Sequence, residues 1–586
     1  MKQKVLYLFL SLMLMSISVS AQTGGGRITG VVIDDSGEEP LPGTTIFIEE
    51  LKKGIATNEH GDFSFSDIPT GTYTLTVSFM GYRTQTRKVT VGNERGSKII
   101  IRLKADSKSL DEVVVMGKSE ARKIREQAMP ISVISMSQIQ GTVNNVQDVL
   151  AKTAGITVRT MGGVGSTSRV SVRGLEGKRI GLFIDGQPMN DNSDFIDIND
   201  IPVEMIDRIE IYKGIVPAKF GGSAVGGAVN IVIKEYPPKY LDVNYSYGSF
   251  NTHKASVVSK MNIAPKGIEF GLGGFYNYSD NNYKMKSPFQ EGLTITRDHD
   301  KFKKAVVGGS FKARKWWFDL VEFEPVFIHT YKDVQGIESN SHSDAFIIAN
   351  KMEKENFLLE GLDFDWQLGY VYTSYHFTDT ASHRTHWDGT HYPAVSKFGG
   401  EIGKWASLLV NNKHLLQHKL NLNYLVNDNH SVNFNSLSKY AHANPKDAMK
   451  DKVIGYRTEF PSNMLSWVAG VNYDYRSSDD KFLNSVNIKY YYYSMKTRMA
   501  SILTNSAEDI NTHKNDFGIS NALRYRITPN LMAKASLGYD VRLPSEEELL
   551  GDGYIIAPAG NLIPERNTSV NVGMLFDLTG KSPSNL

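Results

Sequence analysis

The chain has 586 residues, of which 41% are hydrophobic and 22% are charged, a balance that excludes both a disordered chain and a bundle of membrane helices. Lysine and arginine total 65 against 63 acidic residues, so the basic excess of a nucleic-acid-binding protein is absent. The sequence contains no cysteine, which excludes disulfides, thiolate metal sites, a cysteine nucleophile and a lipoprotein anchor.

The first 21 residues have the pattern of a secretory signal peptide. Lys2 and Lys4 precede an apolar run over 5–15, and small residues lead to Ala21. A short membrane anchor is the alternative, but the run is too short to span a bilayer. No later stretch approaches the roughly 20 apolar residues that a spanning helix needs. A mature chain embedded in a membrane would therefore have to be a closed β-barrel.

Residues 27–104 are dense in strand and turn signals. Residues 71–77 alternate polar and apolar side chains, as a half-buried strand does, and about seven such strands predict a small β-sandwich. The segment resembles the carboxypeptidase-regulatory-like domain, and the matching residues are Gly30, Asp34, Pro42, Gly43, Thr57, Gly61, Phe63, Gly71, Tyr73, Gly81 and Tyr82. His60 lies in a turn and no HxxE pair occurs, so we expect a solvated histidine and no peptidase chemistry.

Residues 105–118 are predicted to be a linker with one β-prone run, whose three consecutive valines favour an extended strand. Two interpretations are open, namely the last strand of the sandwich, or a strand to which a partner protein adds its own. The run resembles the Ton box of TonB-dependent receptors, which pairs with the energy-coupling protein TonB. The resemblance implies that the TonB-binding residues are Asp111, Glu112, Val113, Val114 and Val115.

Residues 119–235 mix helix and strand signals. A helix is predicted over 137–154, with Gly155 as its stop, and a strand over 180–184. The glycines at 162–165 are not followed by the GK[ST] of a phosphate loop, and a strand rather than a helix follows the glycines at 221–227. Neither glycine run therefore predicts a nucleotide site.

Four motifs in this segment match, in order and spacing, the plug of TonB-dependent receptors: 172–174, 183–186, 206–214 and 220–231. Asp207 stands where the family more often has glutamate. The resemblance implies these functional plug positions: Arg173, Asp185, Gly186, Arg208, Gly214, Gly221, Gly226 and Gly227. By family position, Arg173 and Arg208 are expected to pair with barrel carboxylates, and the alternative is that each only stabilises the fold. Glycine suits a plug that brings its backbone close to a surrounding wall.

Residues 236–586 hold all six tryptophans and show repeated alternation, for example over 268–276, 420–424 and 531–539. Apolar–polar alternation in segments of about ten residues with aromatic ends is typical of an outer-membrane β-barrel. At about 20 residues per strand and loop, the segment predicts roughly 16–18 antiparallel strands. The alternative is a soluble β-sandwich or propeller. Residues 528–530 are predicted to be a short periplasmic turn, and extracellular loops are predicted over 280–300, 378–405 and 441–456.

The stretch 542–566 resembles an internal landmark of these barrels, and family barrels have 22 strands. Only 20 residues follow Arg566, and the last six residues lack a terminal aromatic side chain. An open barrel would leave unpaired strand edges in lipid. We therefore expect an incomplete barrel, as a fragment, a split gene or a chain that needs a complement.

The resemblance as a whole implies active import of a scarce small molecule across the outer membrane, driven by TonB and its inner-membrane energising complex. Siderophore, haem or cobalamin-like cargo is favoured over an oligosaccharide, because the GYG form of the Ton box and the greater length of glycan-importing receptors are absent. Other interpretations are a signalling receptor and a non-transporting, truncated remnant.

Histidines cluster in one predicted loop: His376, His383, His386 and His391. Such a cluster either binds a transition metal or haem, or is simply solvated. No Ser-His-Asp spacing, nucleophile elbow or HExxH motif occurs, so no enzyme activity and no resident cofactor are predicted.

Overall fold

The computed structural model describes residues 26–576 and forms two compact units, Met1–Gly117 and Lys118–Leu586. The residues it does not describe within that range are 36–39, 59, 80–81, 83, 93–98, 105–123, 136–145, 161, 190–196, 199, 218–219, 223, 238, 264–266, 288–289, 315, 335–337, 387–388, 395–397, 403–404, 502–505 and 554–555. The predicted signal peptide and the predicted Ton box, residues 111–115, lie outside the described residues. None of the described helices has the length and apolarity needed to cross a membrane.

The first unit is the predicted β-sandwich, built from seven strands in two sheets. The strands are β1 (Gly26–Asp34), β2 (Thr45–Ile48), β3 (Lys53–Ala56), β4 (Asp62–Ile68), β5 (Gly71–Ser78), β6 (Gln85–Val91) and β7 (Ile99–Leu103). One sheet has the order β4-β1-β7 and the other β3-β2-β5-β6. Alternate residues of β5 are buried between the sheets, which confirms its predicted amphipathic pattern.

The second unit begins with a small α/β segment, the plug, whose main sheet has the order β13-β12-β15-β14-β8. A second sheet has the order β11-β10-β9. The elements are β8 (Ile131–Ser135), α3 (Val146–Ala151), β9 (Ile156–Thr160), β10 (Ser168–Val172), β11 (Leu175–Glu176), η2 (Gly177–Arg179), β12 (Ile180–Ile184), β13 (Gln187–Pro188), η3 (Val203–Met205), β14 (Ile206–Lys213) and β15 (Gly227–Ile233). Isoleucine and valine side chains form its core.

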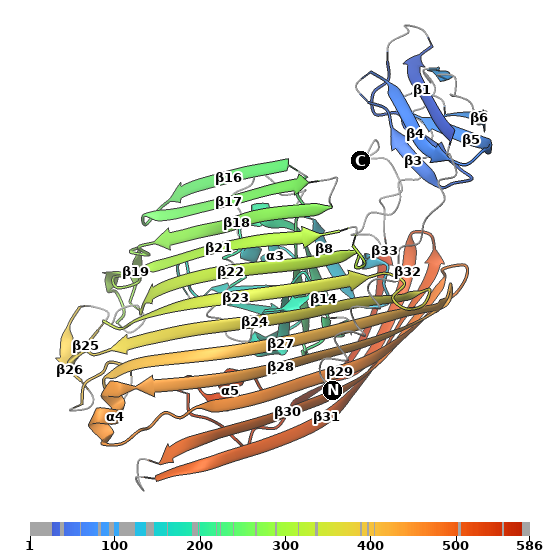
Figure 1. Ribbon diagram of the computed structural model, residues 1–586. Coiled ribbons are helices and arrows are strands. Elements are labelled where there is room, and N and C mark those ends of the chain that lie inside the picture. The colour runs from blue at the N-terminus through green and yellow to red at the C-terminus, as the bar shows by residue number, and fades with distance from the viewer. Residues whose placement is uncertain are drawn as a thin grey trace, which may run out of the picture. The chain divides into compact units, whose positions relative to one another are not determined.

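The rest of this unit is one 14-stranded antiparallel sheet that curves around the plug (Figure 1). In sheet order its strands are β16 (Lys239–Gly248), β17 (Thr252–Ile263), β18 (Ile268–Ser279), β21 (Phe302–Ala313), β22 (Leu320–Asp333), β23 (Asn340–Lys354), β24 (Leu362–Asp379), β27 (Ser407–Asn427), β28 (His430–Asp447), β29 (Ser462–Arg476), β30 (Phe482–Ser501), β31 (Ser506–Thr528), β32 (Leu531–Arg542) and β33 (Glu565–Phe576). We call β16 to β24 the first wall and β27 to β33 the second wall.

The two ends of the sheet differ. At the short-turn end, neighbouring strands are joined by brief turns such as 428–429 and 529–530. At the long-loop end, the connections carry further elements: β19 (Lys284–Lys286), β20 (Thr294–Thr296), β25 (His383–Thr385), β26 (His391–Pro393), α4 (Ala448–Ile454) and α5 (Glu546–Leu550). Ser545 and Glu548 form a capping box that starts α5. The prediction of a loop over 441–456 is partly wrong, because strand β28 continues to Asp447.

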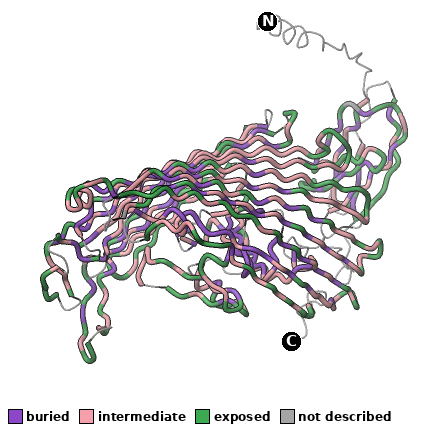
Figure 2. The backbone as a smooth tube through the Cα atoms, turned by 90° about the horizontal axis from the view of Figure 1, so that it is seen from below, coloured by how far each residue is buried: buried purple, intermediate pink, exposed green. Residues whose placement is uncertain are grey.

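Exposed and less exposed residues alternate along the strands (Figure 2). The outward positions are apolar or aromatic, as on β16, where Leu241, Val243, Tyr245 and Tyr247 are each at least 66% exposed. The inward positions are mostly polar and face the plug. An apolar outer face with a polar interior is the arrangement that lipid around a barrel requires.

Among the residues that the structure describes, this sheet has 14 strands, fewer than the roughly 16–18 predicted. The reason is strand length, since β27, β30 and β31 have 21, 20 and 23 residues. An estimate of about 20 residues per strand and loop therefore divided the segment too finely. Among the described residues, β16 and β33 each pair with one neighbour in the sheet.

Candidate functional site

The turn after β12 holds two of the predicted plug positions, Asp185 and Gly186. Asp185 has a positive φ of 49° and accepts a hydrogen bond from the Ile233 amide at 3.0 Å. Gly186 donates its amide to Asn230 Oδ1 at 2.9 Å and its carbonyl accepts from Lys419 Nζ at 2.7 Å. Burial raises the pKa of Asp185 to about 6, against the opposing effects of the Ile233 amide and of Lys351 and Lys312. The side chain nevertheless keeps access to water.

Two predicted plug glycines sit where a side chain has no room. A Cβ on Gly227 would lie 2.2 Å from the Tyr212 carbonyl, and its φ of 123° is strained for any other residue. A Cβ on Gly226 would lie 2.6 Å from Ile180. Gly214 and Gly221 face the second wall, next to Asn571 and Leu437 respectively. These contacts explain why the chain uses glycine where the plug meets its own sheet and the wall.

The two predicted plug arginines have different partners from those expected. Arg208 pairs with two carboxylates of the plug itself, Asp207 at 3.0 Å and Glu210 at 2.9 Å. Arg173 donates to the side-chain amide oxygen of Asn571 on the second wall. The described contacts therefore place Arg208 within the plug fold and give Arg173 an amide, rather than a carboxylate, on the wall.

Several side chains of the second wall hold the plug by its main-chain carbonyl groups. Four inward cations donate to main-chain carbonyl oxygens of the plug. The contacts are Lys419 to Gly186 at 2.7 Å, Lys489 to Val216 at 3.4 Å, Lys534 to Arg125 at 2.6 Å and to Met129 at 3.1 Å, and Arg524 to Glu126 at 3.2 Å. Asn567 adds a side-chain amide donated to the Val225 carbonyl at 2.8 Å.

The start of the plug carries a buried ionic anchor. Glu126 is 5% exposed and its carboxylate meets Arg526 Nη2 at 2.8 Å. Arg526 also meets Asp480 at 2.9 Å, and the neighbouring Arg524, itself 2% exposed, meets the other Asp480 oxygen at 2.7 Å. Two arginines and two carboxylates thus compensate one another at the short-turn end.

A second charged network joins the plug to the segment around α5. Arg179 meets Glu565 at 2.5 Å, and Glu565 also accepts from Arg542 at 2.9 Å. Arg542 continues to Glu548 at 2.8 Å. Lys178 meets Glu547 at 2.7 Å. These contacts tie η2 of the plug to the chain between β32 and β33.

The first wall uses its charges differently. Lys260 pairs with Glu269 at 3.0 Å and Lys351 with Glu353 at 2.5 Å, so both partners belong to the same wall. Its clearest ionic contact with the plug is Lys304 with Asp200 at 2.5 Å, both nearly fully buried. At the long-loop end, Asn281 holds the plug loop between β9 and β10. Its Oδ1 accepts from the Val164 amide and its Nδ2 donates to the Val164 carbonyl, each at 2.9 Å.

The four predicted loop histidines do not form one cluster. His376 lies on β24 and stacks on His342 of β23, with ring centroids 4.3 Å apart. His383 and His391 face each other across the β25–β26 hairpin at 4.3 Å, and His383 Nε2 lies 3.3 Å from Glu338. His386 contacts Tyr392. Within the part of the chain that the structure describes, no group of three or more histidine, aspartate or glutamate side chains is arranged to hold a metal ion.

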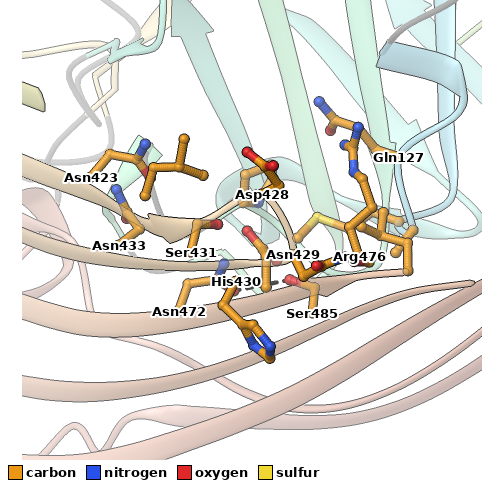
Figure 3. Close-up of a pocket in the computed structure, with 16 residues that line it drawn as sticks. Gln127, Asn423, Asp428, Asn429, His430, Ser431, Asn433, Asn472, Arg476 and Ser485 are labelled. Carbon is orange, nitrogen blue, oxygen red and sulfur yellow. Dashed lines mark hydrogen bonds between the residues drawn. The ribbon is translucent and has the colours of Figure 1, made fainter. Parts of the chain in front are cut away.

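A cavity of about 410 Å³ lies between the start of the plug and the second wall at the short-turn end (Figure 3). Neither this cavity nor the Glu126 anchor was predicted from the sequence. The sequence carried only a weak signal for either of them, because their residues are single charged or amide side chains at inward positions of strands with an alternating pattern. Only the strand register shows which of them meet the plug.

Comparison with known families agrees with this architecture. Residues 28–115 match the CarboxypepD_reg-like domain, residues 123–228 the TonB-dependent receptor plug domain, and residues 340–582 the TonB-dependent receptor-like β-barrel. The chain belongs to the TonB-dependent receptors. Receptors of this family are outer-membrane proteins, which assigns the chain to that membrane. The first match extends over residues 111–115 of the predicted Ton box.

Two relatives and one solved structure show what this receptor is similar to. It is 29% identical over 248 residues, 41% of its own length, to TonB-dependent receptor P39 of Formosa agariphila, and 32% identical over 123 residues, 21% of its length, to the vitamin B12 transporter BtuB of Vibrio vulnificus. These matches span 23% and 20% of the two relatives. The solved siderophore receptor PirA of Acinetobacter baumannii shares the fold, with a TM-score of 0.57 over 78% of this chain and 69% of that one, at 12% identity. These relatives are receptors and transporters, not enzymes.

Proposed function

We propose that this receptor imports a scarce small molecule across the outer membrane, using force delivered by TonB. The observation that carries the proposal is the anchored plug inside a wall with an apolar outer face. A plug held by many hydrogen bonds and ion pairs blocks free diffusion through the wall. A molecule of cargo can pass only when that attachment is loosened, which requires an energy source.

The orientation follows from the two ends of the sheet. Short turns belong to the periplasmic side of outer-membrane barrels and long loops to the extracellular side. The plug start at Glu126 therefore faces the periplasm, and in sequence it follows shortly after residues 111–115. The β25–β26 hairpin and the tip contact at Asn281 face the outside, where cargo arrives.

The proposed partner segment is the run over 111–115, with TonB adding a strand to its backbone. TonB in turn would draw on its inner-membrane energising complex. Strand addition uses main-chain hydrogen bonds, so the identity of each side chain matters little while each N–H group matters. A substitution at Val114 that removes the N–H group can therefore test whether this segment binds TonB.

In the test, Val114→Pro removes one N–H group and Val114→Thr keeps it, in full-length receptor produced in cells. We expect Val114→Pro to abolish energised uptake of a bound cargo, and Val114→Thr to leave uptake near the level of the unmodified chain. Binding to the cell surface should be equal in both variants. Uptake that survives Val114→Pro unchanged would contradict transport through this segment.

For the cargo, we propose a siderophore, haem or cobalamin-like molecule. The relatives support this class only in part, since BtuB is named for vitamin B12 and PirA for a siderophore. An oligosaccharide is the alternative. Uptake of radiolabelled ferric chelates, haem, cobalamin and oligosaccharides by cells with and without the receptor distinguishes the two classes.

A further inference from the structure

A band of histidines lies on the outer face of the sheet, toward the long-loop end. It takes one residue from each of the neighbouring strands β22, β23, β24, β27 and β28, and we call it the histidine band: His329, His342, His376, His414 and His442. Each histidine is next in sequence to a buried residue of the same strand: Ile328, Ser343, Phe377, Leu415 and Ala441. Because side chains alternate between the two faces of a strand, the five histidines face outward.

The histidines of the band lie close to one another. His342 and His376 are directly opposite in register, and their rings stack with centroids 4.3 Å apart. His414 and His442 are also opposite each other, with ring centroids 6.3 Å apart. His329 Nδ1 lies 2.8 Å from Asp344 Oδ1. The band therefore contains two histidine pairs and one histidine that is paired with a carboxylate.

The charge of the band depends on pH. Among the described residues, the other titratable side chains at neighbouring outward positions are Lys303, Tyr331, Asp333, Asp344, Tyr370, Tyr372 and Tyr440. Asp333 is nearly fully buried and accepts a hydrogen bond from the Tyr331 hydroxyl. An imidazole gains a positive charge as the pH falls from about 8 to about 5. Five protonated rings and Lys303 then outweigh the two carboxylates, so the band is cationic at mildly acidic pH.

The band also marks the level at which the outer face changes from apolar to polar. The next outward residues toward the short-turn end are apolar or aromatic and at least 46% exposed: Phe327, Leu416 and Tyr440. The next outward residues toward the long-loop end carry hydroxyl or amide groups: Tyr331, Asn412 and Asn444. In an outer-membrane barrel, the apolar outer band ends at the level of the lipid headgroups. The orientation inferred above makes these the headgroups of the outer leaflet.

We propose that the histidine band binds the phosphate of an anionic lipid headgroup in the outer leaflet, and binds it more tightly as the pH falls. Charge complementarity supports this occupant, because protonated imidazoles at headgroup depth offer a phosphate both positive charge and N–H donors. The proposal does not depend on import, since it concerns the outer face of the sheet and not the plug. A transition metal ion held by the paired histidines is the competing occupant.

Lipid binding by the purified receptor tests the proposal. The full chain is purified in a neutral detergent with EDTA, which removes metal ions, and bound radiolabelled lipid is measured after gel filtration. The probes are dimyristoyl phosphatidylglycerol and dimyristoyl phosphatidylcholine, which have the same acyl chains. Phosphatidylglycerol keeps one negative charge between about pH 5.5 and about pH 7.5, so a change in its binding reports the charge of the protein.

At about pH 5.5 we expect the receptor to bind phosphatidylglycerol at least about fivefold more tightly than phosphatidylcholine, the factor that one cationic side chain near an anionic headgroup contributes. At about pH 7.5 the preference should fall below about twofold, because most imidazoles are then neutral. A preference that stays constant with pH would overturn the proposal. So would a preference that appears only when zinc or nickel ions replace EDTA, because a metal would then occupy the band.

Substitutions locate the site. A variant that combines His342→Gln, His376→Gln, His414→Gln and His442→Gln cannot take up protons at these positions, so the pH-dependent preference should be lost. His430→Gln is the matched control, because His430 lies on the same face of β28 as His442 but at the short-turn end, and it should leave the preference unchanged.

His414→Lys guards against a loss that comes only from misfolding. The variant carries a permanent positive charge, so it should show a preference of about fivefold even at about pH 7.5. A folding defect cannot produce such a gain. Absence of the gain, or a loss in His430→Gln equal to that in the combined variant, would refute the assignment of the site to the histidine band.

Discussion

The two walls around the plug have similar strands but use their charges in opposite ways. On the first wall, lysines such as Lys260 and Lys351 pair with glutamates on the same wall. On the second wall, Lys419, Lys489, Arg524 and Lys534 donate to plug carbonyls. The ion pairs of the first wall are therefore largely internal to it, whereas these four cations of the second wall lose hydrogen-bond acceptors if the plug leaves. The difference indicates that the plug is released from the second wall at the greater cost.

The largest expected effect is at the ionic anchor. Glu126→Ala leaves Arg526 buried without its plug carboxylate, and breaking a buried pair costs about 3–5 kcal/mol. We expect the free energy of local opening of β8 to fall by about that amount. Hydrogen exchange measured by mass spectrometry reports it directly. Exchange of β8 that matches the unmodified chain would contradict the idea that the second wall holds the plug.

A smaller effect is expected at Lys534. Lys534→Met keeps the length of the side chain but removes the donor to the Arg125 and Met129 carbonyls. Hydrogen bonds to charged groups contribute about 1.5–3 kcal/mol, so the opening free energy of β8 should fall within that range. Lys303→Met, at an exposed position of the first wall, is the matched control and should change nothing measurable.

Removing an ion pair of the first wall should change the opening free energy of the plug less than either variant of the second wall. The double variant Lys260→Met with Glu269→Gln neutralises a pair that does not touch the plug. We expect the opening free energy of plug amides to change by less than about 1 kcal/mol, since the variant sites and the plug share no partners. A plug that opens as readily as in Glu126→Ala would show that the two walls are equivalent after all.

The smallest expected effect is the pH dependence of plug opening near Asp185. The pKa of Asp185 is raised to about 6, above its unfolded value, so its contribution to stability is fully present below about pH 4 and is lost as the pH rises through 6. After correction for intrinsic exchange rates, plug amides next to β12 should open more easily at pH 7 than at pH 5. Asp185→Asn should remove this dependence. Access to water screens the charge and keeps the effect small.

The fold class was predictable because it depends on patterns that the chain repeats. Alternation predicted strands with one apolar face, and four linked plug motifs identified the family, which the matching models confirm. Strand number was not predictable, since alternation continues through strands such as β31 that extend well past an ordinary length. The predicted start of the loop at residue 441 was wrong for the same reason, because β28 extends to Asp447.

The site was less predictable than the fold. The glycines near 186 and 227 were found because a motif marks them, and the structure shows the close approaches they allow. Glu126, Arg526 and Lys534 belong to no motif, and the two wall residues lie 400 and 409 residues from their plug partners Glu126 and Arg125 in sequence. Which inward residue meets which plug atom depends on register, and a shift of one residue would turn each of them outward. The Ton box remains a prediction.

The carbonyl contacts of the second wall have a consequence for how plugs change over time. A main-chain oxygen is present whatever side chain its residue carries, so Arg125, Met129, Gly186 and Val216 can be replaced without removing the acceptor that the wall uses. This part of the attachment is thereby separated from plug sequence. A plug transplanted from a distant homologue should keep these carbonyl contacts as long as its backbone follows the same course, and only side-chain pairs such as Glu126 with Arg526 would have to be matched.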